Sequence, residues 1–536
     1  MRRFGWSALV LIGILAAPHF ARAGDDAPAV VLRVKSLDTV LKNLKLLAAL
    51  VGQEQAAADI QGLIDKKTGK KGLEGIDMDR PVGAYVKFGA EVTDLNLAML
   101  IPVADQNAFM TLLENLGTNP KKEKGGVYTL QAKDTELFLR FANKYAYITA
   151  FDRDNLLDKN LLDPAKALAG PKDSLLSASL RLDKLPDGAR LIVVSALDEK
   201  IHEAIDSAPK EDSDAQKAFR KAALKQVGRT ISDVITEGKA ARVDINLDEV
   251  KKDISIKLSM SARPKTELAK TIQNAAAGKS PFAGLLPAGA AFRGSIDAVF
   301  PDALRTSFAK LMDEAAKKGL ADIADPAKRK QTQQLIDAIM PSIRAGELDA
   351  FFGMTGPVKD HYTLLAAVRV QEGDKLGTMV ESFIASEMKS MSPGDRAKIK
   401  LNVDSAGGVK IHKFELPPDA KTGTVLGGLP GDPNLHVAFR KDAAFFAIGP
   451  TALQTIKDAI ANQQAGKAPV ALFDLDIARI APSLASTDEL KALASKLFAG
   501  KESHVRVSIE GGDALTLQVN VGLEVLEFLA KVNEKQ

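Results

Sequence analysis

Hydrophobic and polar positions follow the same pattern in two distant stretches of the chain. Residues 95–116 (LNLAMLIPVADQNAFMTLLENL) and residues 362–383 (YTLLAAVRVQEGDKLGTMVESF) align without a gap at an offset of 267 residues. Each stretch has an apolar run, then a short acidic or amide-rich break, then apolar residues at helical spacing. Such a pattern predicts a strand, an N-capped turn and a helix. We therefore expect an internal duplication of the chain.

The apolar patterns around the first stretch predict further strands and helices. Short alternating runs predict strands at residues 29–34, 82–88, 127–131, 137–141, 145–150, 175–182, 190–195, 242–247 and 254–261. Helical spacing predicts helices at residues 37–50, around 60–64, and at 154–168, 199–235 and 266–277. Ser36 is placed to cap the first of these helices, and Pro209 marks a break in the fourth.

The second half of the chain repeats this order of patterns. Alternating runs predict strands at residues 290–296, 348–354, 409–415, 435–439, 443–448, 470–475, 504–509 and 514–521. Helices are predicted at residues 304–311, 335–343, 451–460, 488–498 and 523–532. The Gly/Pro-rich stretch Gly278–Pro287 is the predicted linker at the midpoint.

Consecutive strands joined by hairpins predict largely antiparallel sheets with helices packed on one face. The predicted fold class is α+β, in two homologous tandem halves, because repeats of this length indicate duplicated domains and not a solenoid. After a signal peptide at residues 1–23, the first half divides into a larger unit and a smaller unit, and the second half repeats them. The predicted boundaries are 24–170, 171–281, 282–466 and 467–536.

Three short motifs support a family resemblance. They are S-L-D-x-x-L after a strand at Ser36–Leu41, G-I-D at Gly75–Asp77 before Arg80-Pro81-Val82, and P-V-x-D at Pro102–Asp105. With these motifs the chain resembles a family of exported bacterial proteins known only as a domain of unknown function. The resemblance covers most of the mature chain and implies export and a modular α+β architecture. Because the family has no established catalytic or binding residues, the resemblance assigns none here.

The N-terminus predicts export by a cleavable signal peptide. Arg2 and Arg3 precede a short apolar run at Ser7–Ala17, and Ala21–Ala23 is a small-x-small cleavage site. The alternative is an uncleaved anchor, but the run is shorter than the roughly 20 residues that span a bilayer. Every later apolar run is broken by charge before that length. The predicted location is the periplasm or the exterior.

Composition excludes several classes of function. The chain has no cysteine, which rules out disulfides, thiolate metal sites and cysteine nucleophiles. Without the signal peptide, 69 basic residues face 68 acidic residues, which is no footprint for nucleic acid or an anionic membrane surface. Aromatic residues make up only 5% of the chain, so a carbohydrate-binding role loses weight.

The mature chain has five histidines, none in a close metal-binding pair: His202, His361, His412, His436 and His504. His412 and His436 lie on neighbouring predicted strands and could approach each other in space. We favour the interpretation that they face solvent. A histidine-dependent site would be confined to the second half.

Two pairs of aspartates are spaced to share one face of a strand. Asp77 with Asp79, and Asp474 with Asp476, could in principle hold a cation. No calcium loop is completed at either place, and we favour solvated faces or turn caps. The run Ala276–Ser280 imitates a phosphate-binding loop, but Gln273 stands where that loop needs a glycine.

No motif assigns a catalytic, cofactor-binding or metal-binding residue, and no cofactor is expected. The predicted function is a non-enzymatic envelope protein that binds or scaffolds an envelope protein or another ligand through the surface where its halves meet. The first alternative is a carrier of a hydrophobic small molecule or lipid. Phe351-Phe352 and Phe445-Phe446 suggest it, because they could line an apolar cavity, but we favour the interpretation that they fill the cores of the two halves. The second is a hydrolase using paired carboxylates or a serine, which predicts buried ionisable groups converging in a cleft.

Overall fold

The computed structural model describes residues 27–534, apart from 51, 69–72, 90–94, 133–134, 151, 208, 210, 286–288, 360, 417–433, 463–464, 486 and 501. The predicted signal peptide and its cleavage site lie outside the described residues. The fold is α+β, with 44% helix and 33% strand. Within the described part, no helix combines the length and apolar character needed to cross a membrane.

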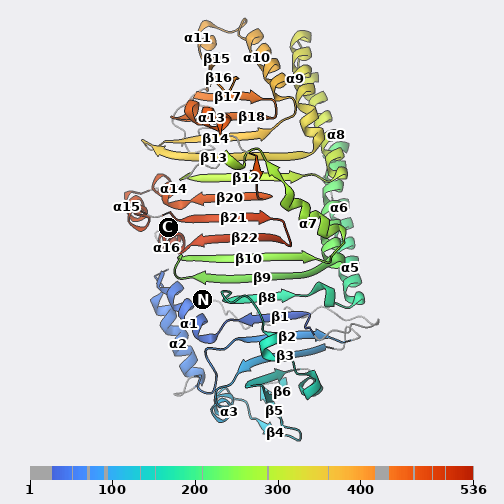
Figure 1. Cartoon of the computed structure of the whole chain (residues 1–536), viewed down its shortest axis with the longest axis vertical. Coiled ribbons are helices and arrows are strands. Elements are labelled where there is room, and N and C mark those ends of the chain that lie inside the picture. The colour runs from blue at the N-terminus through green and yellow to red at the C-terminus, as the bar shows by residue number, and fades with distance from the viewer. Residues whose placement is uncertain are drawn as a thin grey trace. The chain divides into compact units, whose positions relative to one another are not determined.

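The chain forms two compact units (Figure 1). The first unit comprises residues up to 199 together with 232–268, and the second comprises 200–231 together with residues from 269 onward. Three helices cross these boundaries: α5 (Asp187–Asp206), α6 (Asp214–Glu237) and α7 (Glu267–Ala277).

The first unit is built on an antiparallel sheet with the described strand order β10-β9-β8-β1-β2-β3-β7-β6-β5-β4. The strands are β1 (Val30–Val34), β2 (Val82–Phe88), β3 (Leu95–Pro102), β4 (Lys121–Lys122), β5 (Val127–Ala132), β6 (Thr135–Ala142), β7 (Tyr145–Thr149), β8 (Leu176–Leu180), β9 (Gly238–Asp248) and β10 (Asp253–Ala262). The further helices and 3-10 turns are α1 (Leu37–Leu50), α2 (Glu54–Thr68), α3 (Gln106–Asn115), η2 (Arg153–Leu156), η3 (Asp158–Asn160), α4 (Pro164–Ala167) and η4 (Leu182–Lys184).

The second unit has an antiparallel sheet with the described order β22-β21-β20-β12-β13-β14-β18-β17-β16-β15. The strands are β12 (Phe292–Val299), β13 (Glu347–Val358), β14 (His361–Arg369), β15 (Ile399–Ala406), β16 (Val409–Glu415), β17 (Asn434–Arg440), β18 (Ala443–Ile448), β20 (Ala471–Asp476), β21 (His504–Glu510) and β22 (Leu515–Gly522). A separate pair is β11 (Lys279–Ser280) with β19 (Gly466–Lys467). The helices are η5 (Ala283–Leu285), α8 (Asp302–Ala321), α9 (Pro326–Ala345), α10 (Gly373–Glu387), α11 (Pro393–Ala397), α13 (Ala452–Ala461), α14 (Ile477–Leu484), α15 (Asp488–Leu497) and α16 (Leu523–Glu534).

The two sheets have the same order of neighbours along the chain. Counted from corresponding ends, β1 matches β12, β2 matches β13, β3 matches β14 and β8 matches β20. The registers also match. Gly83 pairs with Leu100 in the first unit and Phe351 pairs with Ala367 in the second, and Leu100 and Ala367 are 267 residues apart. The two sheets therefore correspond strand by strand, while the duplication of the chain stays a prediction.

The two stretches of matching pattern form the predicted strand and helix in each unit. Asp105 caps α3, since its Oδ1 accepts a hydrogen bond of 2.8 Å from the Ala108 amide. The matching Glu372 lies in the left-handed region, with φ 52°, and makes no side-chain cap to α10. The expected N-capped turn is therefore present only in the first copy.

Helical segments cover both faces of the larger sheets. In the first unit, Phe109 and Leu113 of α3 pack on one face, and Leu156 of η2 belongs to a separate core with Tyr85 and Tyr147. In the second unit, Ile456 of α13 packs with Phe445 on one face, while Gly377 of α10 lies against Phe439 on the other. The expectation of helices on one face is thus incomplete for these sheets.

The helix predicted at residues 154–168 is wrong. The structure has two short 3-10 turns and α4 instead, because Asp152 and Asp163 each cap a separate turn. Leu157 and Leu161 between these turns are extended, and Pro164 starts α4.

The strand predicted at residues 190–195 is also wrong, because these residues belong to α5. The β-branched run favours a strand locally, but β8 already pairs with β1 on one side and β9 on the other. No adjacent position on β8 is left for it, so tertiary structure overrides the local preference.

The predicted linker Gly278–Pro287 does more than connect the halves. Its described part pairs as β11 with β19, and Phe282 and Leu285 are buried in the core of the second unit. The apolar side chains within this Gly/Pro-rich stretch, among them Phe282 and Leu285, were the signal for this packing.

Candidate functional site

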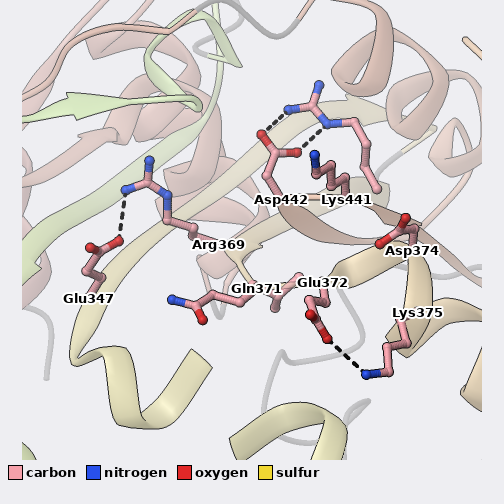
Figure 2. Close-up of a pocket in the computed structure, with 10 residues that line it drawn as sticks. Glu347, Arg369, Gln371, Glu372, Asp374, Lys375, Lys441 and Asp442 are labelled. Carbon is pink, nitrogen blue, oxygen red and sulfur yellow. Dashed lines mark hydrogen bonds and ion pairs between the residues drawn. The ribbon is translucent and has the colours of Figure 1, made fainter. Parts of the chain in front are cut away.

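A cleft of about 930 Å³ lies in the second unit where β14 leads into α10 (Figure 2). It is lined by the start of β13, the β14–α10 connection and the β17–β18 turn. The lining residues are Glu347, Arg369, Val370, Gln371, Glu372, Asp374, Lys375, Arg440, Lys441 and Asp442. Eight of these ten residues carry a charge, so the cleft offers several charged groups to a ligand.

Backbone contacts hold the walls of the cleft together. The Val370 amide donates to the Asp442 carbonyl at 3.1 Å, and the Gly373 amide donates to the Lys441 carbonyl at 2.8 Å. A Cβ on Gly373 would lie 2.1 Å from the Arg440 carbonyl oxygen, so this approach requires glycine. These contacts bring the start of α10 to the β17–β18 turn.

Six of the charged side chains in the cleft form three ion pairs. Arg440 Nε lies 2.6 Å from Asp442 Oδ1, Lys375 Nζ lies 3.1 Å from Glu372 Oε2, and Arg369 Nη1 lies 3.4 Å from Glu347 Oε2. All six side chains are partly exposed, and pairs with a single contact are worth only about 0–1 kcal/mol each, whereas Arg440 is held by both oxygens of Asp442. A charged ligand can therefore replace a partner at little cost.

A pair of acidic side chains lies beside the cleft residue Arg369. Asp349 on β13 and Asp297 on β12 are direct cross-strand partners, and Asp349 is only 2% exposed. The Ser280 hydroxyl donates to Asp349 Oδ1 at 2.7 Å, whereas Oδ2 accepts no hydrogen bond from the described residues. Arg369 Nη1 lies 3.8 Å from that oxygen. Arg369 thus connects the cleft to a buried carboxyl group.

Burial raises the pKa of Asp349 to about 6. The charges of Asp297 and Glu347 contribute to this rise, whereas the Ser280 hydrogen bond and the charge of Arg369 oppose it. Burial also raises the pKa of Asp297. A buried carboxyl group with a raised pKa readily takes up a proton in mildly acidic solution.

The structure places His412 and His436 on the neighbouring strands β16 and β17, as expected. Both are buried, however, so the interpretation that they face solvent is wrong. The register pairs His412 with Val437 and His436 with Lys413, which puts the two rings on opposite faces of the sheet. They do not approach each other to form a site.

Asp77 and Asp79 form a turn and not one face of a strand. The Asp79 amide donates to Asp77 Oδ1 at 3.3 Å, and Ile76 makes an isolated bridge with Val103. This agrees with the turn cap that we favoured for the pair.

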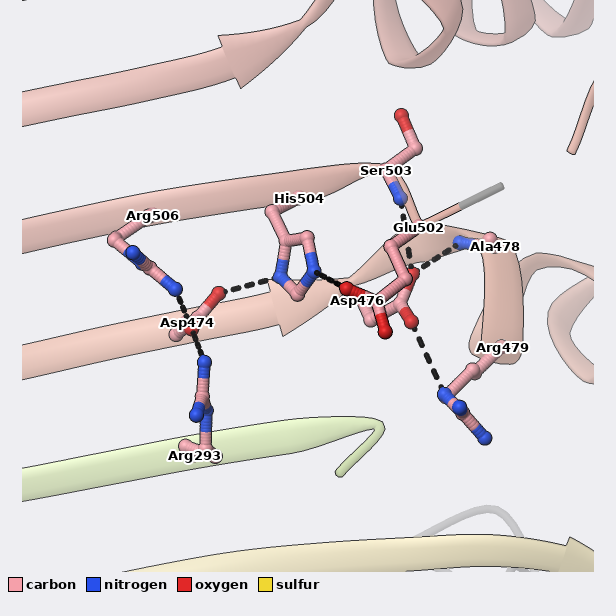
Figure 3. A network of polar contacts seen from close by, with 9 residues as sticks. All are labelled: Arg293, Asp474, Asp476, Ala478, Arg479, Glu502, Ser503, His504 and Arg506. Atoms are coloured by element: carbon pink, nitrogen blue, oxygen red, sulfur yellow. Dashed lines mark hydrogen bonds and ion pairs between the residues drawn. The ribbon is translucent and has the colours of Figure 1, made fainter. Parts of the chain in front are cut away.

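Asp474 is the buried centre of a polar network (Figure 3). Its Oδ1 lies 2.7 Å from His504 Nδ1, and its Oδ2 accepts from Arg506 at 2.6 Å and also from Arg293. Burial by itself raises the pKa of Asp474, but the hydrogen bonds from Arg506, Arg293 and His504 outweigh it and hold the pKa below its ordinary value. The solvated face that we expected for Asp474 is wrong.

Asp476 is buried as well and caps α14. Its Oδ1 accepts from the amides of Ala478 at 3.1 Å and Ser503 at 3.3 Å, and its Oδ2 accepts from Arg479. The turn-cap interpretation is confirmed for this residue. Across the described residues, no group of three or more His, Cys, Asp or Glu side chains is arranged to hold a metal ion.

Sequence reasoning missed Arg369, Asp349 and Asp297. A signal was present in the sequence, because Asp349 lies two residues before the buried Phe351. Residues two apart on a strand share a face, so Asp349 falls on the inward face. An acidic residue at such a position indicates either a structural pair or a functional group.

No family model matches the chain, and no curated protein matches it. One solved structure, described as crystal form IV of TP0453, is 11% identical and covers 46% of this chain and 82% of its own, with a TM-score of 0.21. A likeness of that size carries no argument about fold or function.

Proposed function

We propose that the chain is an exported, non-enzymatic binding protein of the cell envelope, and that its ligand is a small polar molecule or peptide end with charged groups. The observation that carries this proposal is the cleft beside α10, where charged side chains line the wall and Arg369 and Lys375 form weak, exchangeable pairs. Its volume of about 930 Å³ falls in the range of ligand sites.

The buried acids favour binding over hydrolysis. Ser280 and Asp349 do converge beside the cleft, which is what a hydrolase of the paired-carboxylate or serine kind requires. Both side chains are buried, however, and the Ser280 hydroxyl is held by Asp349 while its oxygen accepts the Phe282 amide. A nucleophile must reach the reacting atom of its substrate, so this arrangement supports a structural role for Ser280.

Native mass spectrometry of the mature protein, isolated from its own envelope, tests the proposal. We expect a small extra mass that leaves on denaturation and is lost in the variant Arg369→Gln. The matched control is Arg440→Gln, which is expected to weaken retention less, because Arg440 is held by both oxygens of Asp442. A bare mass for the wild-type protein, or only protein-sized additions, would contradict a cleft ligand and favour a scaffold.

A second candidate function is a carrier of a hydrophobic molecule, for which one observation speaks. Phe352 and Phe473 are 53% and 43% exposed, and both pair with Gly294 across neighbouring strands. Cross-strand partners share a face, so the two rings flank a glycine on one exposed apolar strip. A fluorescent fatty acid should then bind to the wild-type protein and bind more weakly to the variant Phe473→Ser. Equal binding by both proteins would remove this candidate.

A further inference from the structure

We infer that the cleft binds the anionic group of its ligand through Arg369, and that this binding takes up a proton at the buried Asp349, the cross-strand partner of Asp297. The inference rests on the proposed function, because it assigns the charge class of the ligand and a regulation of the same cleft.

Arg369 is shared between two carboxyl groups that differ in burial. Its Nη1 lies 3.4 Å from Oε2 of the exposed Glu347 and 3.8 Å from Oδ2 of the buried Asp349. The Arg369 side chain itself is 37% exposed and lines the cleft, so a ligand can reach it. A guanidinium group presents five N–H donors in a planar fork, which suits a carboxylate, phosphate or sulfate group.

The proton decides how strongly Arg369 is held by the protein. When Asp349 is ionised, its buried Oδ2 has Arg369 as its cationic partner among the described residues, because the other groups that face it are Asp297, Glu347 and the Ser280 hydroxyl. Drawing Arg369 away would then leave a buried charge uncompensated, which is unfavourable. When Asp349 is protonated, that charge is gone, and Arg369 is free to exchange Glu347 for an external anion.

The direction of the linkage follows from this exchange. Because burial raises the pKa of Asp349 to about 6, the protonated form is populated below that pH and lost above it. Anion binding should therefore be strong in mildly acidic solution and weaken as the pH rises. By reciprocity, a bound anion must raise the pKa of Asp349 further.

A cation is the less suitable ligand for the acid pair. Asp349 is almost fully buried, and the described residues hold no cluster of ligands arranged for a metal ion. A Cβ on Gly278 would lie 2.4 Å from Asp297 Oδ2, so the backbone at Gly278 approaches this carboxyl group closely. An incoming group meets Arg369 at the cleft and not the acids behind it.

Sulfate is the probe for the test, because its charge is constant between pH 5 and 8. Full-length mature protein labelled with ¹⁵N-arginine is titrated with sodium sulfate, and the Arg369 Nε–H signal is followed by NMR. That signal is assigned by its loss in Arg369→Lys. We expect the dissociation constant at Arg369 to rise about 5- to 20-fold between pH 5 and pH 7.5, which is a usual strength for coupled binding.

Two variants separate the proton from the anion site. Asp349→Asn keeps a neutral acceptor for Ser280 and should bind sulfate equally at both pH values, at the affinity of the wild type at pH 5. Glu347→Gln removes the exposed partner of Arg369, so it should bind more tightly at both pH values while keeping the pH dependence. A wild-type affinity that does not change with pH, or a pH dependence that survives in Asp349→Asn, would overturn the proton linkage.

The outcomes also separate this inference from the proposed function. Sulfate binding at Arg369 without pH dependence leaves the cleft a binding site and refutes only the linkage. Failure of the Arg369 signal to respond at pH 5 refutes the anion class, whereas the small retained mass expected from the native envelope would still support a cleft ligand of another kind. A response confined to other arginines would refute Arg369 as the binding group.

Discussion

The cleft of the second unit and the matching place in the first unit differ in chemistry although their strands correspond. Register matching places Pro102 of the first unit at the position of Arg369, Pro81 at Asp349 and Lys35 at Asp297. None of these residues offers the first unit a buried acid beside an exposed arginine.

The first unit also fills this place with its own chain. The Gly75 carbonyl accepts the amides of Ala104 at 2.9 Å and Asp105 at 3.4 Å, and these two residues match the cleft residues Gln371 and Glu372. In the second unit, the Gln371 amide donates instead to the Ser342 hydroxyl at 2.8 Å. One sheet topology thus supports a packed connection in one unit and a charged cleft in the other.

The largest expected effect is a loss of stability on substituting Asp474, the buried centre of the polar network in the second unit, compared with the matching residue of the first unit. Asp474→Ala leaves Arg293 and Arg506 without their shared buried carboxylate, so thermal or urea unfolding should show a loss of about 3–5 kcal/mol. Ser179 occupies the matching position on β8, and Ser179→Ala should cost less than about 1 kcal/mol. Equal losses in the two variants would contradict the assigned difference.

A substitution at Gly75 tests whether this segment is tightly packed on α3. Gly75 has φ 93°, and an added Cβ would lie 2.2 Å from the Phe109 amide nitrogen. Gly75→Ala should therefore lower the free energy of unfolding by about 2–4 kcal/mol, through strain and overpacking together. Gly125→Ala has a similar φ of 84° in open space and should show only the backbone strain, about 1 kcal/mol. Similar losses for both would show that the contact at Phe109 is unimportant.

The pH dependence of stability tests the buried acid of the cleft. Because the pKa of Asp349 is raised to about 6 in the folded state, its stabilising contribution is complete below the unfolded pKa of roughly 4 and is lost as the pH rises through 6. Asp349→Asn should remove that loss. Between pH 4 and pH 7.5, the variant should therefore lose about 1–2 kcal/mol less of its free energy of unfolding than the wild type does. Urea unfolding at both pH values measures this. Glu347→Gln, on the same strand but exposed, should leave the loss in place, and an unchanged pH profile in Asp349→Asn would refute the raised pKa.

The smallest expected effect contrasts the two helix starts. Asp105→Ala removes the cap of α3 and should cost about 1 kcal/mol of stability. Glu372→Ala should change stability by less than about 0.5 kcal/mol, because Glu372 makes no cap to α10 and its partner Lys375 is exposed. A larger loss at Glu372 than at Asp105 would reverse the comparison.

The order of strands and helices followed well from the sequence, because alternation and helical spacing report which face of each element is buried. The strand Val82–Phe88 and the helix Leu37–Leu50 have the predicted bounds, and Ser36 Oγ accepts the Thr39 amide at the start of that helix. The strand expected at residues 190–195 failed because a run of valines and isoleucine carries no information about which sheet edge is free.

The charged cleft could not be predicted in the same way. Asp297, Asp349 and Arg369 lie on three different strands, and only sheet register brings them together. Local spacing instead singled out Asp474 and Asp476, which the structure uses to hold arginines and to start a helix. The sequence shows a charge at an inward position, but not the partner that decides its role.

Hydrogen–deuterium exchange most directly tests whether the ligand binds at the cleft of the second unit. The protein is compared with and without the small-molecule fraction extracted from its native cells. We predict slower amide exchange at residues 370–376 and at the 440–443 turn, and unchanged exchange at the matching residues 103–109 and 142–145 of the first unit. Equal slowing in both units, or slowing only in the first, would contradict the account.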